Sequence, residues 1–417
     1  MTVPENKKAV IVGYDAISPL GADLDRQWQR ALAGESGIGP LTRFPLRDGF
    51  PVAVAGQVPD IDGESYPFLS PRHQAAWFSP VFKYGLLAVT RALARSGVDI
   101  DAALAPRVAT TFSSAVGGLD AVLHADRRLQ AEDRLPHPYT NPNSCINMIG
   151  GKIAMHTGAQ GPILATITAC ATGLTSMLVG AMLLAQDRAD MVICGAVDCA
   201  LVEPIVAGFA TMNGAYTPKD GQQEAPAVAS RPFSLNRRGF VISEGAGAVI
   251  LATREFAHAH GLHYAAELAG WSMTSDAHHF VMPHMETVRR CMGEAISDAG
   301  LAPCDIDAVN AHATSTRVGD KVEYDALTAV FNGQPPPVSA NKSQIGHAMG
   351  ASSAIETILA LRGMEEGLLL PTINLLFDPE IPLDCVAEGT RQLDQRHILK
   401  NAFGFGGCNA CAVFRRT

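Results

Sequence analysis

Short, almost continuous apolar runs alternate along the chain with longer segments whose apolar residues recur at helical spacing. Residues 86–97 and 172–186 show the helical spacing and predict helices. Such an alternation predicts an α/β fold whose sheets are covered on both faces. The short runs, which are bounded by Gly, Pro or Asp and predict buried strands, are residues 9–14, 109–114, 163–169 and 191–197.

The second half of the chain repeats this pattern. Its predicted strands are residues 263–273, 307–313 and 411–416, and its predicted helices are residues 288–300 and 353–364. In each half a predicted strand leads to a reactive side chain, Cys170 in one and His312 in the other. We therefore predict a duplicated unit, with a half at 1–255 that carries the cysteine and a half at 256–417 that carries two histidines.

Composition narrows the class of protein. The 417 residues are 47% hydrophobic and 18% charged, with a net charge of −9, which excludes a disordered chain and argues against a nucleic-acid platform. The apolar run at 177–185 is shorter than the roughly 18 residues of a membrane span. Cys408 and Cys411 are closely spaced, but no second pair lies in range, so neither zinc nor disulfides are predicted. We expect a soluble, cytoplasmic protein.

The segment ITACATGLTSMLVGAMLLA places Cys170 between a predicted strand and an apolar helix. The start of a helix favours a thiolate over a thiol, and the small neighbours Ala169, Ala171 and Gly173 leave room for a bulky group above the sulfur. A buried cysteine that acts as a small hydrophobe is the alternative. The placement therefore makes Cys170 a candidate nucleophile.

Two histidines lie in surroundings rich in glycine and hydroxyl groups. His312 follows an apolar strand and precedes Ala-Thr-Ser-Thr, and His347 lies in SANKSQIGHAMGAS. Near the C-terminus, NAFGFGGCNACAVF carries three glycines around Phe405, which would let backbone N–H groups approach a ligand oxygen. A simple turn between two strands is the alternative for this glycine-rich segment.

Taken together, TACATG, NAHATSTRVGDKVE, ANKSQIGHAMGAS and NAFGFGG resemble the 3-oxoacyl-[acyl-carrier-protein] synthases, condensing enzymes of the thiolase fold. RPFSLNRRGFVISEGAGAVIL (231–251) is similar to a segment of their type I/II elongating branch, and the match runs in order along the whole chain. The resemblance implies a duplicated, five-layered αβαβα architecture with mixed sheets.

The resemblance also implies an acyltransferase that needs no metal and no cofactor. Cys170 would carry the acyl chain as a thioester, and the enzyme would join it to malonyl-acyl carrier protein by decarboxylative Claisen condensation. The backbone N–H groups of Cys170 and Phe405 would form the oxyanion hole. His312 and His347, as neutral imidazoles, would hold the charge that decarboxylation places on the malonyl thioester oxygen.

By the same resemblance, four charged residues would orient His312 and balance its charge, and three residues would line or close the acyl pocket. A solvated helix face is the alternative for Glu323 and Glu356. The supporting residues are Lys342, Asp320, Glu323 and Glu356. The pocket residues are Val116, Phe209 and the gating Phe405.

Several positions depart from the family's pattern. Ser234 and Arg238 stand where Asp is usual, Ala313 replaces a glycine, and Asn213 replaces a frequent arginine. In residues 73–85, where relatives carry several Lys or Arg that dock acyl carrier protein, this chain has only Lys83, which bears on the identity of the carrier.

Fatty-acid elongation is the main hypothesis, and a specialised ketosynthase of a polyketide or polyene pathway with a dedicated carrier protein is the alternative. A non-catalytic, chain-length-determining subunit would lack the nucleophile. The resemblance also implies a homodimer, in which residues 163–169 would continue the sheet across the two-fold axis. A heterodimer with a related subunit is the alternative.

Overall fold

The computed structural model describes residues 3–61, 66–218 and 224–417. Within these ranges nine strands join into one continuous sheet, which consists of two half-sheets joined at their edges. The first half-sheet runs in the order β4 (Val108–Ser113), β5 (Met191–Cys199), β6 (Glu244–Thr253), β1 (Ala9–Ile17). The second runs β7 (Ala266–Ser275), β13 (Cys408–Arg416), β12 (His397–Gly404), β8 (Ala308–Asn310), β9 (Val338–Ser339).

The two half-sheets repeat one topology. In the first, β1 pairs antiparallel with β6, β6 antiparallel with β5, and β5 parallel with β4. In the second, β7, β13, β12 and β8 pair with the same sequence of directions. The half-sheets meet where β1 and β7 pair at Val10↔Glu267 and Ile11↔Ala266. The matching directions show an internal duplication.

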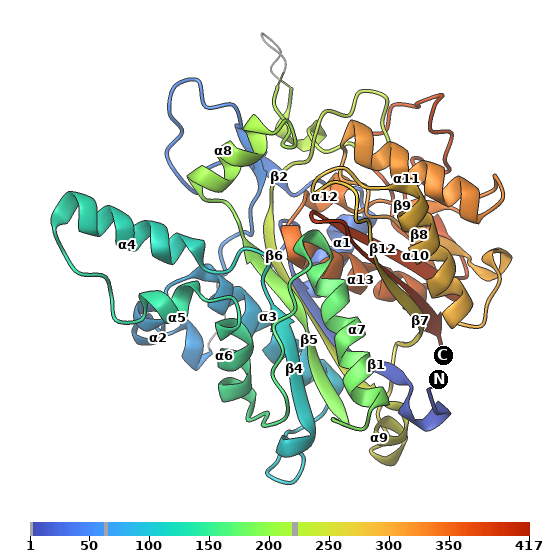
Figure 1. Ribbon diagram of the computed structural model, residues 1–417, viewed down its shortest axis with the longest axis horizontal. Coiled ribbons are helices and arrows are strands. Elements are labelled where there is room, and N and C mark those ends of the chain that lie inside the picture. The colour runs from blue at the N-terminus through green and yellow to red at the C-terminus, as the bar shows by residue number, and fades with distance from the viewer. Residues whose placement is uncertain (1–2, 62–65, 219–223) are drawn as a thin grey trace.

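Helices form the other layers (Figure 1). The central layer is α7 (Thr172–Ala185) and α13 (Met349–Glu366), whose apolar residues share one core with the facing sides of both half-sheets. On the outer faces, α3 (Pro80–Ser96) packs on the first half-sheet, and α10 (Met285–Asp298) with α11 (Arg317–Val330) packs on the second. These are the five layers expected.

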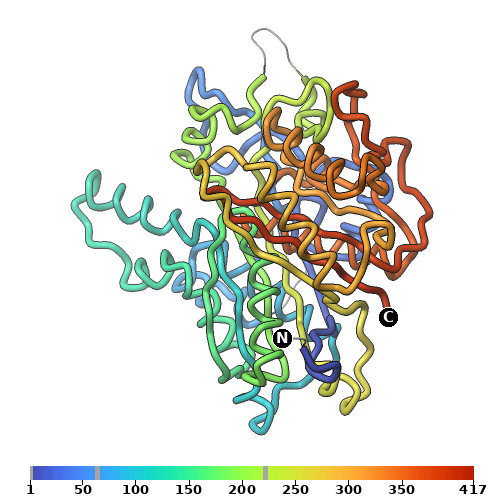
Figure 2. The backbone as a smooth tube through the Cα atoms, turned by 45° about the vertical axis from the view of Figure 1, so that its right-hand side comes forward, coloured from blue at the N-terminus to red at the C-terminus, as the bar shows by residue number. Residues whose placement is uncertain are grey.

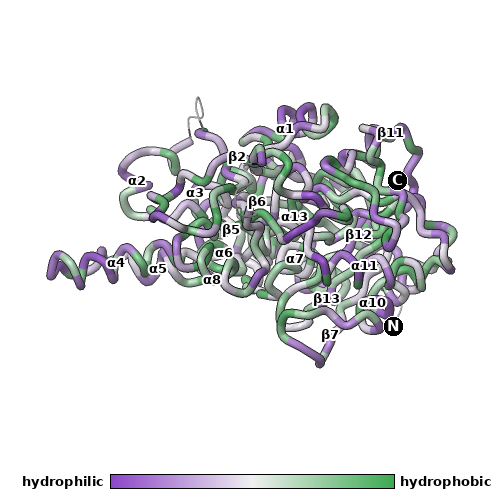
Figure 3. The backbone as a smooth tube through the Cα atoms, turned by 90° about the horizontal axis from the view of Figure 1, so that it is seen from above, coloured by the Kyte–Doolittle hydropathy of each residue, from purple (hydrophilic) through white to green (hydrophobic). Residues whose placement is uncertain are grey.

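Strand residues alternate between cores, because successive side chains point to opposite faces of a sheet. In β13, Ala412 and Phe414 face the central core, whereas Cys411 and Val413 face the outer one. Both faces of the sheet are therefore apolar, which explains the nearly continuous hydrophobic runs in the sequence. Figure 3 shows these central elements largely hydrophobic and the projecting helix α4 (Leu119–Glu132) largely polar.

The remaining helices are shorter or peripheral. They are α1 (Leu24–Leu32), α2 (Pro71–Ala76), α5 (Thr140–Ser144), α6 (Met148–Thr157), α8 (Glu203–Thr211), α9 (Arg254–Ala259) and α12 (Lys342–Ile345). Two small two-stranded sheets lie apart from the main sheet: β2 (Ile38–Pro40) with β3 (Val54–Gly56), and β10 (Leu368–Leu369) with β11 (Arg391–Gln392). Figure 2 shows α4 and α5 extending away from the body of the molecule. In the described ranges, no helix is long and apolar enough to cross a membrane.

The strand predicted at 163–169 is wrong for the single chain. Of this segment, within the described residues, Ile163 alone forms a β-bridge, to Thr110. The bridge is parallel, as is the β8–β9 pair at the equivalent edge of the second half-sheet. Beyond Leu164, whose N–H donates to the Thr110 carbonyl, the segment has no neighbouring strand to pair with. Its apolar composition therefore does not reflect burial in this sheet.

Candidate active site

Cys170 lies in a 3₁₀ turn, Ala169–Ala171, directly before α7. Ala169 has φ = +48°, a left-handed conformation that is costly for a residue with a Cβ and that occurs mostly where the surroundings enforce it. Thr172 helps to enforce it, because its hydroxyl accepts the Thr168 N–H at 3.0 Å and donates to the Ala169 carbonyl at 2.7 Å. The strained turn thus fixes the sulfur at the start of the helix.

The turn between β12 and β13 lies against the nucleophile. A Cβ on Gly404 would be 2.2 Å from the Thr168 carbonyl oxygen, so only glycine permits this approach. As a result, the backbone N–H groups of Phe405 and of Cys170 itself lie near the Cys170 sulfur and act to lower the pKa of the thiol. The two predicted oxyanion-hole donors are therefore neighbours, and NAFGFGG is a strand followed by a turn.

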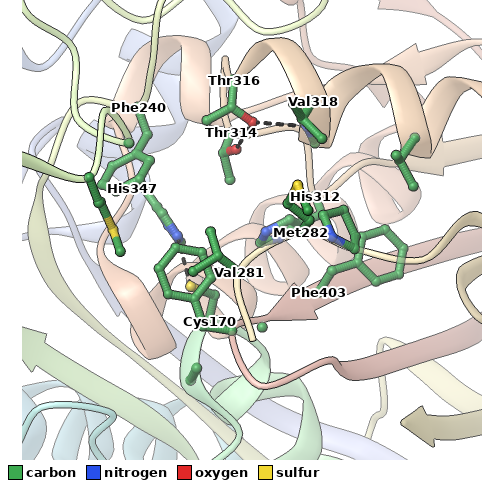
Figure 4. Close-up of a pocket in the computed structure, with 18 of the residues that line it drawn as sticks. Cys170, Phe240, Val281, Met282, His312, Thr314, Thr316, Val318, His347 and Phe403 are labelled. Atoms are coloured by element: carbon green, nitrogen blue, oxygen red, sulfur yellow. Dashed lines mark hydrogen bonds between the residues drawn. The ribbon is translucent and has the colours of Figure 1, made fainter. Parts of the chain in front are cut away.

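Two histidines complete the centre (Figure 4). His347 Nε2 lies 3.0 Å from Cys170 Sγ, and the His312 ring lies edge-on to the His347 ring with centroids 5.7 Å apart. His347 is held by its backbone, whose N–H donates to the Val241 carbonyl at 2.7 Å. Three side chains that are distant in sequence therefore meet at one point.

Below the histidines lies a buried group of charges. Lys342 Nζ donates to the His312 carbonyl at 2.5 Å and to Glu356 Oε1 at 2.6 Å. Lys400 Nζ donates to the other carboxylate oxygen of Glu356 at 2.7 Å. The side chains of Lys342, Glu356 and Lys400 are at most 1% exposed. Lys342 and Glu356 were predicted as site residues from the sequence, whereas Lys400 was not.

The two acidic residues of α11 differ in what they contact. Glu323 accepts the backbone N–H groups of His312 at 2.9 Å and of Ala313 at 2.7 Å. Asp320 accepts the N–H of Phe233 at 2.7 Å and that of Thr316 at 3.3 Å, so it fixes neighbouring loops and not His312 itself. The alternative of a solvated helix face is wrong for Glu323 and Glu356, since both are buried.

Burial dominates the protonation states. It lowers the pKa of His312 and of His347 well below the usual range, and the nearby charges of Lys342 and Lys400 act in the same direction. Both imidazoles are therefore neutral at neutral pH. Burial also raises the pKa of the Cys170 thiol to about 12, even though Lys342 and two N–H groups oppose the shift. The helix start favours the thiolate, but desolvation of the buried sulfur outweighs that effect.

A cavity of about 700 Å³ opens above the sulfur. Val116, Phe209 and Phe405, the predicted pocket residues, all line it. The Phe209 ring lies 6.4 Å from the Phe405 ring and packs edge-on against Phe240 at 5.2 Å. His279 also lines this cavity. The cavity leaves space for a group attached to Cys170.

Comparison with known proteins agrees with this geometry. The model of the β-ketoacyl synthase N-terminal domain matches residues 6–257, and that of the C-terminal domain matches residues 265–376. A cysteine that follows a strained residue, with two neutral histidines beside it on a duplicated α/β scaffold, is the arrangement of a condensing enzyme of the thiolase fold. The chain belongs to the β-ketoacyl synthase family, and the resemblance deduced from its motifs is confirmed.

Relatives of known name match over nearly the full length. The 3-oxoacyl-[acyl-carrier-protein] synthase 2 of Coxiella burnetii is 34% identical over 419 residues, and that of Staphylococcus aureus strain COL is 33% identical over 418, each covering 99% of both chains. Among solved structures, a β-ketoacyl synthase from Burkholderia phymatum STM815 superposes with a TM-score of 0.90 at 28% identity, covering 98% of this chain and 99% of that one. The ishigamide ketosynthase/chain length factor superposes with a TM-score of 0.88 at 28% identity and the same coverage.

Proposed function

We propose that this enzyme joins an acyl group, carried on Cys170, to malonyl-acyl carrier protein by decarboxylative Claisen condensation, giving 3-oxoacyl-carrier protein and CO2. Fatty-acid elongation is the setting that the named relatives favour. The observation that carries the proposal is the 3.0 Å contact between Cys170 Sγ and His347 Nε2, with His312 beside them, at the base of a cavity of about 700 Å³.

In the first step, the Cys170 sulfur attacks the carbonyl carbon of an acyl-carrier thioester. The new C–S bond forms, the bond to the carrier sulfur breaks, and the carrier leaves as a thiol that takes up the proton lost by Cys170. Negative charge develops on the carbonyl oxygen, where the N–H groups of Cys170 and Phe405 stabilise it. Because these donors are already in place, they need no reorganisation during the reaction.

In the second step, the bond between the malonyl carboxylate and its α-carbon breaks and CO2 leaves. The electron pair forms an enolate whose charge rests on the thioester oxygen, within reach of the imidazoles of His312 and His347. The α-carbon then attacks the acyl carbonyl, the bond to Cys170 breaks, and the sulfur regains a proton from solvent. Neutral imidazoles suit this role because a cationic pair would be repelled by Lys342 and Lys400.

The carrier protein is the partner that this reaction requires. One structural neighbour, at 25% identity and a TM-score of 0.87, is described as a type II polyketide synthase acyl-carrier protein in complex with its ketosynthase. A dimer of this chain is supported by the apolar edge at Ile163, Leu164 and Ile167, which are 40–46% exposed in the single chain. A homodimer would pair this edge with its own copy, and a related subunit could take the same place.

A specialised ketosynthase of a polyketide or polyene pathway is the second candidate. The type II polyketide ketosynthase and the ishigamide ketosynthase/chain length factor superpose nearly as well as the β-ketoacyl synthase from Burkholderia phymatum STM815. In addition, Arg238 and Asn213, which depart from the family's pattern, both line the cavity. Both candidates share the chemistry and differ in the acyl group and the carrier.

The test is to supply acyl-carrier and malonyl-carrier proteins and to follow CO2 and 3-oxoacyl product by mass spectrometry. Wild-type enzyme is expected to form both, Cys170→Ser to form no condensation product, and His312→Ala and His347→Ala to lose malonyl decarboxylation. Wild-type protein that binds the carriers but forms neither product would instead support a non-catalytic subunit. A panel of saturated and unsaturated acyl groups distinguishes the fatty-acid from the polyene alternative.

A further inference from the structure

Ser352, in the first turn of α13, contacts the catalytic imidazole from the side opposite the sulfur. Its side chain is fully buried. Its hydroxyl oxygen accepts the Ala348 N–H at 2.7 Å and lies 3.0 Å from His347 Nδ1. Among the residues that the structure describes, the hydroxyl has no third hydrogen-bond partner. The run of small residues around Ser352 gave no sign of this contact in the sequence.

The hydrogen-bond inventory decides which atom carries the proton. A hydroxyl has one proton, and Ser352 already uses one lone pair for Ala348. If His347 Nδ1 carried a proton and donated it to Ser352, the serine proton would be buried without an acceptor, which costs free energy. If Ser352 donates to Nδ1, every group is satisfied.

We propose that Ser352 is a positioning residue that holds His347 in the tautomer protonated at Nε2. The Nε2–H then points at Cys170 Sγ, 3.0 Å away. In the resting enzyme it donates to the sulfur. If the enzyme has the function proposed above, the same N–H donates to the thioester oxygen of the malonyl group, where charge develops on loss of CO2. His347 is thereby a hydrogen-bond donor in both steps and does not accept the thiol proton.

The chain offers a matched control in the next residue. Ser353 is buried in the same helix, and its hydroxyl accepts the Leu174 N–H at 3.0 Å and donates to the Gly350 carbonyl at 3.2 Å, with no contact to the imidazole. Ser352→Ala and Ser353→Ala each remove one buried hydroxyl from the start of α13. Only the first removes the donor to Nδ1.

The direct test is ¹⁵N NMR of ¹⁵N-histidine-labelled full-length enzyme, with His347→Asn used to assign the resonances. In the wild type we expect His347 to be protonated at Nε2 and unprotonated at Nδ1, in Ser353→Ala the same, and in Ser352→Ala a mixture of tautomers. This NMR measurement needs no substrate. A wild-type His347 protonated at Nδ1 would overturn the proposal, and so would an unchanged tautomer in Ser352→Ala.

Kinetic measurements provide the second test. Ser352→Ala is expected to lower kcat for malonyl-carrier decarboxylation by about 10-fold or more with little change in KM, because it weakens one preorganised donor. Ser353→Ala should stay within about 3-fold of the wild type, since removing a hydroxyl that does not touch the imidazole leaves that donor in place. Equal kcat values for the two variants would overturn the proposal. Wild-type enzyme with the expected tautomer but without decarboxylation would overturn the proposed function alone.

Discussion

Replacement of Glu356 by Gln tests how the buried charges support the site. The Glu356 carboxylate accepts from Lys342 Nζ at 2.6 Å and from Lys400 Nζ at 2.7 Å, and all three side chains are shielded from solvent. The Glu356→Gln variant would leave two buried ammonium groups facing a neutral amide. Removing one partner of a buried ion pair costs about 3–5 kcal/mol. At about 2.1 cal/mol/K of unfolding entropy per residue, that free energy lowers the Tm by roughly 3–6 °C.

The assay is thermal and guanidinium unfolding, read by circular dichroism, alongside malonyl decarboxylation. Lys400→Met in the Glu356→Gln background removes one uncompensated cation and should recover part of the lost stability. Glu286→Gln is the surface control, because Glu286 pairs with Arg289 in solvent and such pairs contribute about 0–1 kcal/mol. If Glu356→Gln unfolds at the same midpoint as Glu286→Gln, or if Lys400→Met recovers nothing, the electrostatic reasoning is refuted.

Three further predictions concern the nucleophile and its cavity. Alkylation of Cys170 by iodoacetamide should accelerate about 10-fold per pH unit from pH 7 to 10 without a plateau, because burial raises the pKa of the thiol to about 12 and raising the pH increases the thiolate fraction. Val116→Phe should shorten the longest acyl group transferred to Cys170, because the larger side chain fills part of the 700 Å³ cavity. Gly404→Ala should abolish this acyl transfer, since the new Cβ would be 2.2 Å from the Thr168 oxygen.

Each of these predictions has its own control. Cys145 is exposed, so at neutral pH its alkylation should be much faster than that of the buried Cys170. A plateau for Cys170 below pH 9 would contradict the dominance of burial. If Val116→Phe leaves the range of transferred acyl lengths unchanged, the acyl group does not occupy the part of the cavity that Val116 lines. Gly293, in α10, has open space around its Cβ position, so Gly293→Ala should keep activity, and equal activity of Gly404→Ala would disprove the close approach.

The sequence predicted most of the architecture because strands buried on both faces and capped helices leave strong patterns. The helix expected at 86–97 ends where predicted, since Gly97 adopts a left-handed conformation as its C-cap. The segment 163–169 carries the same apolar pattern, but its neighbour strand is missing within one chain. An apolar segment can be buried in the core of one chain or at an interface between chains. The sequence pattern alone could not distinguish these two kinds of burial.

Part of the site could not be predicted because its residues act through contacts that sequence does not reveal. Lys400 lies within the apolar strand HILKNAF. A buried lysine requires a partner of opposite charge, and this was the one feature of the sequence that could have marked Lys400 as a site residue. Its partner Glu356 is 44 residues away, on another element. Ser352 is one of several small residues in its helix. The place of Cys170 at the helix start was expected to favour the thiolate, and the burial that opposes this effect depends on the whole fold.

The most direct measurement is mass spectrometry of the intact enzyme after incubation with acyl-carrier thioesters, followed by peptide mapping. We predict a single added acyl mass on the peptide that contains Cys170, and its discharge when malonyl-carrier protein is added. An unmodified enzyme, or an acyl group on one of the other eight cysteines, would contradict the central claim that Cys170 is the acyl-carrying nucleophile.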